Sequence, residues 1–139
     1  MRRRAKRLTL TAGKYALDTN IAIAVLNGDP VISSRWSAVE AAVLPAPVLG
    51  ELLYGARRSS RRTENEAAIR ALASSMELAV CDEAVCSEYA RIKDALARTG
   101  RPIPENDVWI AACALVSEAI LITRDAHFAA IDGLPLDQW

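Results

Sequence analysis

The sequence has few of the residues that form disulfides, zinc sites and aromatic stacking surfaces. Its 139 residues include three cysteines, one histidine and only 5% aromatic residues. The cysteine number is odd and the spacing matches no zinc or redox motif, which argues against a disulfide framework and a structural zinc site. We therefore expect Cys81, Cys86 and Cys113 to be small buried side chains in a reducing cytosol.

Long apolar runs are also missing. Runs such as residues 109–116 fall well short of the about 18 residues that a membrane-spanning helix needs. The amino-terminus is rich in arginine, but polar residues between positions 9 and 14 interrupt any apolar segment of the kind found in signal peptides. We therefore expect a cytoplasmic protein that does not associate with membranes.

The chain has no net charge, because 17 basic side chains balance 17 acidic ones. This balance alone would argue against a nucleic-acid partner, but the charges are segregated along the chain. Residues 1–14 hold six basic and no acidic side chains, residues 57–70 hold five and two, and residues 101–139 hold two and six. The distribution favours a protein that attracts phosphate at its rim and gathers acidic groups at its centre.

The length and the 52% hydrophobic content fit one globular domain. We predict a basic flexible arm over residues 1–13 and a domain over residues 14–139. Apolar segments typical of strands alternate with helical patterns; strands are predicted at 14–18, 43–46, 77–81 and 119–123, and helices at 19–27, 31–41, from Pro47, 64–75, 82–99 and 105–118. This alternation predicts an α/β fold, a single three-layer α/β/α domain with a short, mostly parallel central sheet.

Four acidic residues stand beside these apolar elements: Asp18, Glu51, Asp107 and Asp125. Each alone is also explained as a helix cap or as a charge that favours the helix dipole. Two follow strands and two lie near helix starts, so together they can meet at the carboxyl edge of the sheet. Carboxylates gathered there repel one another unless a cation is present. Mg²⁺ and Mn²⁺ accept oxygen ligands of this kind and activate water for attack on phosphate esters.

At these residues the sequence resembles the PIN-domain family, most closely the VapC-type toxin ribonucleases of bacterial toxin–antitoxin pairs. Four segments carry the resemblance in the right order: LDTN at 17–20, ELLYGA at 51–56, NDVWIAA at 106–112 and LITRDAHF at 121–128. The resemblance covers nearly the whole chain from about residue 14. It departs from the family's usual pattern in the dozen basic and polar residues that precede the first predicted strand.

The resemblance implies a metal-dependent endoribonuclease that uses Mg²⁺ or Mn²⁺ and acts as the toxin of a toxin–antitoxin pair. It assigns catalysis and metal binding to Asp18, Glu51, Asp107 and Asp125, and supporting contacts around them to Thr19, Asn20 and Thr123. It also implies an RNA substrate, a VapB-like antitoxin as partner and a homodimer.

Arginines near these segments are candidates for RNA contacts, because guanidinium groups match phosphate oxygens. The candidates are Arg57, Arg58, Arg61 and Arg62, which follow the helix of Glu51, and Arg124, which precedes Asp125. A solvated loop is the alternative interpretation of the first four. We interpret His127 as a surface helix residue and not as a catalyst.

Two other functions remain open on the sequence alone. A small-molecule phosphohydrolase or phosphoacceptor of another α/β family is disfavoured, because aspartyl-phosphate enzymes carry a D-x-D motif and position 20 here is asparagine. A non-catalytic RNA-binding module is disfavoured because four carboxylates facing phosphate would weaken binding.

Overall fold

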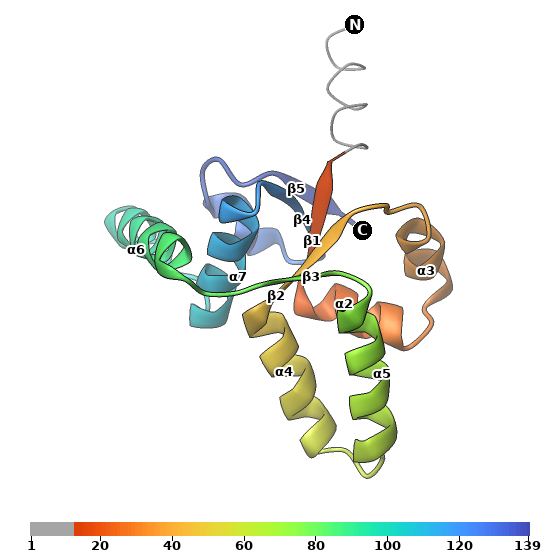
Figure 1. Cartoon of the computed structure of the whole chain (residues 1–139). Coiled ribbons are helices and arrows are strands. Elements are labelled where there is room, and N and C mark those ends of the chain that lie inside the picture. The colour runs from red at the N-terminus through yellow and green to blue at the C-terminus, as the bar shows by residue number, and fades with distance from the viewer. Residues whose placement is uncertain (1–12) are drawn as a thin grey trace, which may run out of the picture.

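The computed structural model describes residues 13–139, which form a five-stranded sheet between two layers of helices (Figure 1). Each strand runs parallel to its neighbours, in the spatial order β3-β2-β1-β4-β5. The strands are β1 (Lys14–Leu17), β2 (Ala42–Pro45), β3 (Glu77–Ala79), β4 (Ala119–Thr123) and β5 (Leu136–Gln138). The predicted α/β class with a short parallel sheet is confirmed.

The helices cover both faces of this sheet. The chain passes from β1 to β3 through α2 (Thr19–Leu26), α3 (Pro30–Trp36), α4 (Ala46–Arg57) and α5 (Arg62–Ser74), and it returns from β3 to β4 through α6 (Glu83–Arg98) and α7 (Glu105–Val116). From β1 through β2 to β3 the chain moves toward one edge of the sheet, and from β3 to β4 it moves back across the sheet. Right-handed crossovers in these two directions place α6 and α7 on the face opposite α2, α3 and α5 (Figure 1). A short 3-10 helix, η1 (Ala126–Ala130), follows β4.

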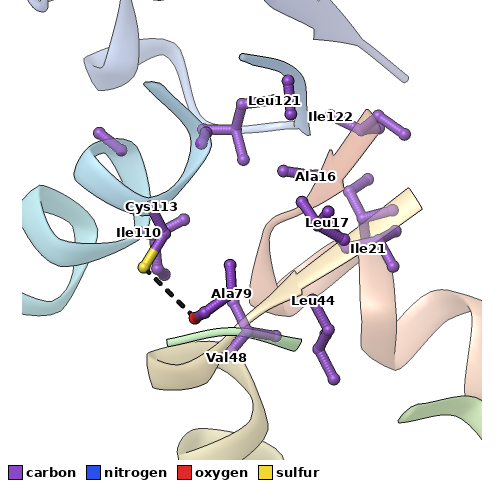
Figure 2. Packing of buried hydrophobic residues seen from close by; sticks show 14 of the residues in the cluster. Ala16, Leu17, Ile21, Leu44, Val48, Ala79, Ile110, Cys113, Leu121 and Ile122 are labelled. Carbon is purple, nitrogen blue, oxygen red and sulfur yellow. Dashed lines mark hydrogen bonds between the residues drawn. The ribbon is translucent and has the colours of Figure 1, made fainter. Parts of the chain in front are cut away.

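The middle of the sheet is apolar because helices exclude water from both of its faces. All five residues of β4 are buried, and so are residues 110–114 of α7, which packs beside it. Figure 2 shows Ile110 and Cys113 of α7 facing the same core as Leu17 and Leu121. This burial fixes α7 against the sheet and so places the exposed first turn of that helix at the sheet's carboxyl edge.

Two elements differ from the sequence prediction. The second helix is predicted over residues 31–41 but ends at Trp36; it begins at Pro30 because Asp29 Oδ1 accepts hydrogen bonds from the backbone of Val31 and Ile32, at 3.0 and 3.1 Å. Strand β5 is not predicted, because Leu136–Gln138 contains two residues of low strand propensity. Its pairing with β4 makes it a strand.

The cysteine prediction holds at one position of three. Cys113 is buried, and its Sγ lies 3.7 Å from the carbonyl oxygen of Ala79 (Figure 2). Cys81 and Cys86 are exposed, which contradicts the expectation of three buried thiols. Cys81 lies two residues after the end of the edge strand β3, where it is exposed although its Sγ is 3.8 Å from that of Cys113, and Cys86 lies in the first turns of the surface helix α6.

The predicted basic arm over residues 1–13 lies outside the described residues except for Gly13. Within residues 13–139, no helix is both long enough and apolar enough to cross a membrane.

Candidate active site

The ends of β1 and β4 place two of the acidic residues at one edge of the sheet. The strand register pairs Leu17 with Ile122, and the backbone N–H of Asp18 donates to the carbonyl of Ile122 at 3.1 Å. Asp18 therefore leaves β1 beside Thr123, the last residue of β4. Asp125 follows two residues later on the same edge, as expected for parallel strands.

Asp18 is almost fully buried, with 2% of its surface exposed. Its Oδ1 accepts a hydrogen bond from the backbone N–H of Thr19 at 2.8 Å and thereby caps α2. Its Oδ2 accepts from the hydroxyl of Thr123 at 2.7 Å, and that hydroxyl oxygen accepts from the N–H of Asp125 at 2.9 Å. This chain of hydrogen bonds fixes the Asp18 carboxylate relative to the backbone of Asp125.

Glu51 reaches the same edge from α4, which begins directly after β2 because Pro47 suits its first turn. The hydroxyl of Thr19 donates to Oε1 of Glu51 at 2.6 Å. This contact joins residues 32 positions apart in the sequence. Thr19 therefore holds the Glu51 carboxylate beside the helix start that Asp18 caps.

Asp107 lies in the first turn of α7, where the helix dipole favours a negative charge. Its Oδ2 lies 2.6 Å from Nε2 of His127, and the two side chains are 16% and 36% exposed. One potential ligand atom from each of Asp107, Asp125 and His127 lies within 4.8 Å of the other two. His127 is therefore not the separate surface residue that the sequence suggests.

The charges at this edge are poorly compensated by other side chains. Burial raises the pKa of Asp18 against the opposing effect of its hydrogen bonds from Thr123 and Thr19, and the charges of Asp107 and Asp125 raise it further. Burial also raises the pKa of Asp107, which the contact with His127 opposes. Within residues 13–139, no lysine or arginine forms an ion pair with any of the four carboxylates. Such an oxygen-rich donor set fits a divalent cation, whose charge offsets the repulsion.

Comparison with known families matches residues 15–134 to the PIN domain. The chain belongs to the PIN domain family. Ribonuclease VapC1 of Haemophilus influenzae (strain R2866) is 33% identical over 130 residues, which cover 90% of this PIN domain chain and 97% of the relative. The tRNA(fMet)-specific endonuclease VapC of Shigella flexneri is 31% identical over 129 residues, which cover 91% and 98%.

Solved structures agree with these relatives. VapBC-1 from nontypeable Haemophilus influenzae has a TM-score of 0.82 at 33% identity, and DNA-bound VapBC from Salmonella typhimurium has a TM-score of 0.85 at 28% identity. Each match covers 91% of this chain and 98% of the other chain. The resemblance of this PIN domain to the VapC ribonucleases is therefore confirmed.

The arginines that follow Glu51 lie toward the far end of α4 and in the turn to α5, at the tip of the helical hairpin (Figure 1). Arg57 is about 9 Å along the helix from Glu51, at about 1.5 Å per residue. The guanidinium carbon of Arg58 lies 5.8 Å from the ring centre of Tyr54. These arginines are therefore at the rim of the PIN domain and not among its carboxylates.

The remaining candidates for RNA binding or supporting contacts do not contact the carboxylates of the site. Arg61 and Arg62 form exposed ion pairs with Glu64 and Glu66. Arg124 has Nη2 at 3.7 Å from Asp29, on the side of α3. Asn20, the second residue of α2, is exposed. The PIN domain thus brings together the acidic residues, Thr19, Thr123 and His127, and leaves the arginines and Asn20 outside this network.

Removal of the Thr123 hydroxyl is expected to destabilise the PIN domain. Thr123→Val leaves Oδ2 of the buried Asp18 and the N–H of Asp125 without their partner, which costs about 1–3 kcal/mol of unfolding free energy. Thr123→Ser keeps the hydroxyl and is the matched control, with a loss well below that of the valine variant. Urea denaturation of both variants measures the difference, and equal losses would show that the hydroxyl contributes nothing.

The raised pKa of Asp18 predicts a pH dependence of stability. The folded state holds the Asp18 proton to higher pH than the unfolded chain, so the contribution is complete below the ordinary value of 3.8 and is lost as pH rises through the raised pKa. The unfolding free energy of the wild type minus that of Asp18→Asn should therefore fall as pH rises above about 4. Urea denaturation of both proteins at a series of pH values above about 4 measures this difference. A difference that rises with pH would contradict the assignment.

Proposed function

We propose that this PIN domain is the toxin ribonuclease of a toxin–antitoxin pair and hydrolyses phosphodiester bonds in RNA with Mg²⁺ or Mn²⁺. The observation that carries this proposal is the meeting of Asp18, Glu51, Asp107 and Asp125, from different elements, at one edge of the sheet. Burial is the main cause of the raised pKa values of Asp18 and Asp107, and the charges of neighbouring carboxylates raise both pKa values further. The VapC ribonucleases among the relatives support the same activity.

The four carboxylates supply oxygen ligands for the ion. When bound, Mg²⁺ or Mn²⁺ activates water and offsets negative charge on the phosphate during hydrolysis. Thr123 and Thr19 orient the carboxylates of Asp18 and Glu51 through hydrogen bonds of 2.7 and 2.6 Å. Asp125 is at the N-cap position of η1, but its side chain makes no capping hydrogen bond, so its oxygens face no competing helix donor. We also assign Asn20, the exposed second residue of α2, to the polar residues that support these carboxylates.

The RNA backbone is proposed to contact the arginines at the rim: Arg57, Arg58, Arg61, Arg62 and Arg124. Arg61 and Arg62 are paired with glutamates only through exposed contacts. Such pairs contribute little to stability, so phosphate can replace the glutamate at small cost. The rim then attracts the RNA while the acidic centre holds the ion.

A VapB-like antitoxin is the proposed protein partner, and a homodimer is the proposed assembly. Solved VapBC complexes from Rickettsia felis and Salmonella typhimurium support the partner, at 26% and 28% identity. Large apolar side chains are exposed on helices of one layer, with Ile23, Val31 and Tyr54 at 41%, 67% and 62%. A partner helix bound across α2, α3 and α4 would bury these three side chains.

The activity is tested with the purified chain, a mixture of cellular RNA and added Mg²⁺ or Mn²⁺. We expect new RNA fragments that EDTA prevents and that either ion restores. A covalent phosphoryl-enzyme trapped with a small phosphate ester would favour a phosphohydrolase instead. RNA binding that is indifferent to EDTA and accompanied by no cleavage would favour a binding module. Either of these results would overturn the proposal.

A further inference from the structure

The side chain of His127 is the one nitrogen donor in a cluster of oxygen donors. Its Nε2 lies 2.6 Å from Oδ2 of Asp107, and the potential ligand atoms of Asp107, Asp125 and His127 lie within 4.8 Å of one another. Donor atoms that neighbour each other around a six-coordinate ion at about 2.1 Å are about 3 Å apart. The present contact is a hydrogen bond from Nε2–H to Oδ2 of Asp107, so binding an ion through Nε2 requires that this proton leave and that the two atoms move apart to about 3 Å.

The position of this ring is determined by the fold. His127 lies in η1, and the next residue, Phe128, is fully buried. The two ring centres are 5.0 Å apart, so the imidazole lies against the anchored phenyl ring. With 36% of its side chain exposed, His127 is open on one side and faces Asp107 on the other. Phe128 therefore fixes the imidazole at the border of the acidic cluster, with Nε2 facing Asp107.

We propose that His127 binds the divalent ion directly through Nε2, which makes the centre a mixed carboxylate–imidazole site that selects Mn²⁺ over Mg²⁺. This inference rests on the proposed metal site and names one further ligand in it. Mn²⁺ and Mg²⁺ both favour oxygen ligands. Mn²⁺ is a transition ion and also accepts an imidazole nitrogen, which Mg²⁺ does far less readily. A site of four carboxylates alone offers both ions the same type of ligand and lacks a nitrogen that favours Mn²⁺.

Pulsed electron paramagnetic resonance of bound Mn²⁺ tests the proposal without reference to activity. The chain contains a single histidine, so a chain without an added histidine tag has only one imidazole that can give a nitrogen coupling to the ion. We expect this nitrogen coupling in the wild type and its loss in His127→Asn. The variant is expected to fold, because the side chain is one-third exposed, and urea denaturation checks this.

Calorimetric titration gives an independent measurement. His127→Asn should raise the Kd for Mn²⁺ about tenfold and change the Kd for Mg²⁺ by less than about threefold. One bound Mn²⁺ without nitrogen coupling, or an equal loss of affinity for both ions, would overturn the role of His127 and leave the carboxylate site standing. Absence of divalent-ion binding to the wild type would overturn both the ligand and the proposed metal site.

Discussion

Asp18→Asn is expected to lower the rate of RNA cleavage by about 100-fold or more, because it removes one of the carboxylates proposed to hold the metal ion. Asp18 is the most buried of the four acids; it directly follows β1, and hydrogen bonds join it to Ile122 and Thr123 at the end of β4. An asparagine of the same shape keeps the contacts with Thr19 and Thr123 within reach, so the fold is retained. Cleavage of a fixed RNA substrate in Mg²⁺ or Mn²⁺ measures the loss.

Asp132→Asn is the matched control, since Asp132 is exposed and lies in the loop after η1. It makes the same change of charge and should leave cleavage within about twofold of the wild type, because distant surface charges are screened by salt. Asp107→Asn and Asp125→Asn should each cause a loss similar to that of Asp18→Asn. Combined losses should be smaller than the product of the single ones, because the three residues act as one site. Full activity of Asp18→Asn would remove the basis for the assignment.

Phe128→Ala lowers the free energy of unfolding by about 3–5 kcal/mol, the usual cost of emptying a buried phenylalanine site. Phe128 is the first of the fully buried side chains by volume and the single phenylalanine of the chain. It also anchors the segment that carries Asp125 and His127, so its loss should weaken Mn²⁺ binding in the molecules that still fold. Urea denaturation followed by tryptophan fluorescence measures the stability.

Phe128→Leu is the control for this prediction. Leucine fills more of the site than alanine does, so the loss of stability should be clearly smaller than for Phe128→Ala. A loss below about 1 kcal/mol for Phe128→Ala would show that the segment after β4 is not anchored by this ring.

The acidic cluster could be predicted from the sequence because its members sit at positions with a general meaning. Asp18 follows an apolar strand, Asp107 opens an apolar helix, and a parallel sheet brings such positions to one edge. The contact between Thr19 and Glu51 could not be predicted, because it depends on how α4 leaves β2 relative to α2. The role of His127 was hidden for the same reason: Asp107 is 20 residues away in the sequence, and only the packing of α7 beside β4 brings them together.

The edge strand β5 shows the limit of local patterns. Its three residues include Asp137 and Gln138, which have little strand preference of their own. Backbone hydrogen bonds with β4 stabilise the extended conformation of this segment. The N–H of Leu121 donates to the carbonyl of Pro135 at 2.9 Å, and the N–H of Trp139 donates to the carbonyl of Thr123 at 3.3 Å. Pairing with an existing sheet, and not propensity, makes this segment a strand.

The most direct test of the carboxylate centre is the sequencing of RNA ends in cells after induced expression of this chain. Expression of the wild type should produce new ends at a small number of defined positions, and expression of Asp18→Asn to the same level should produce none of them. The positions would also identify the RNA target. The same new ends in cells expressing Asp18→Asn, or no new ends with the wild type, would contradict the account.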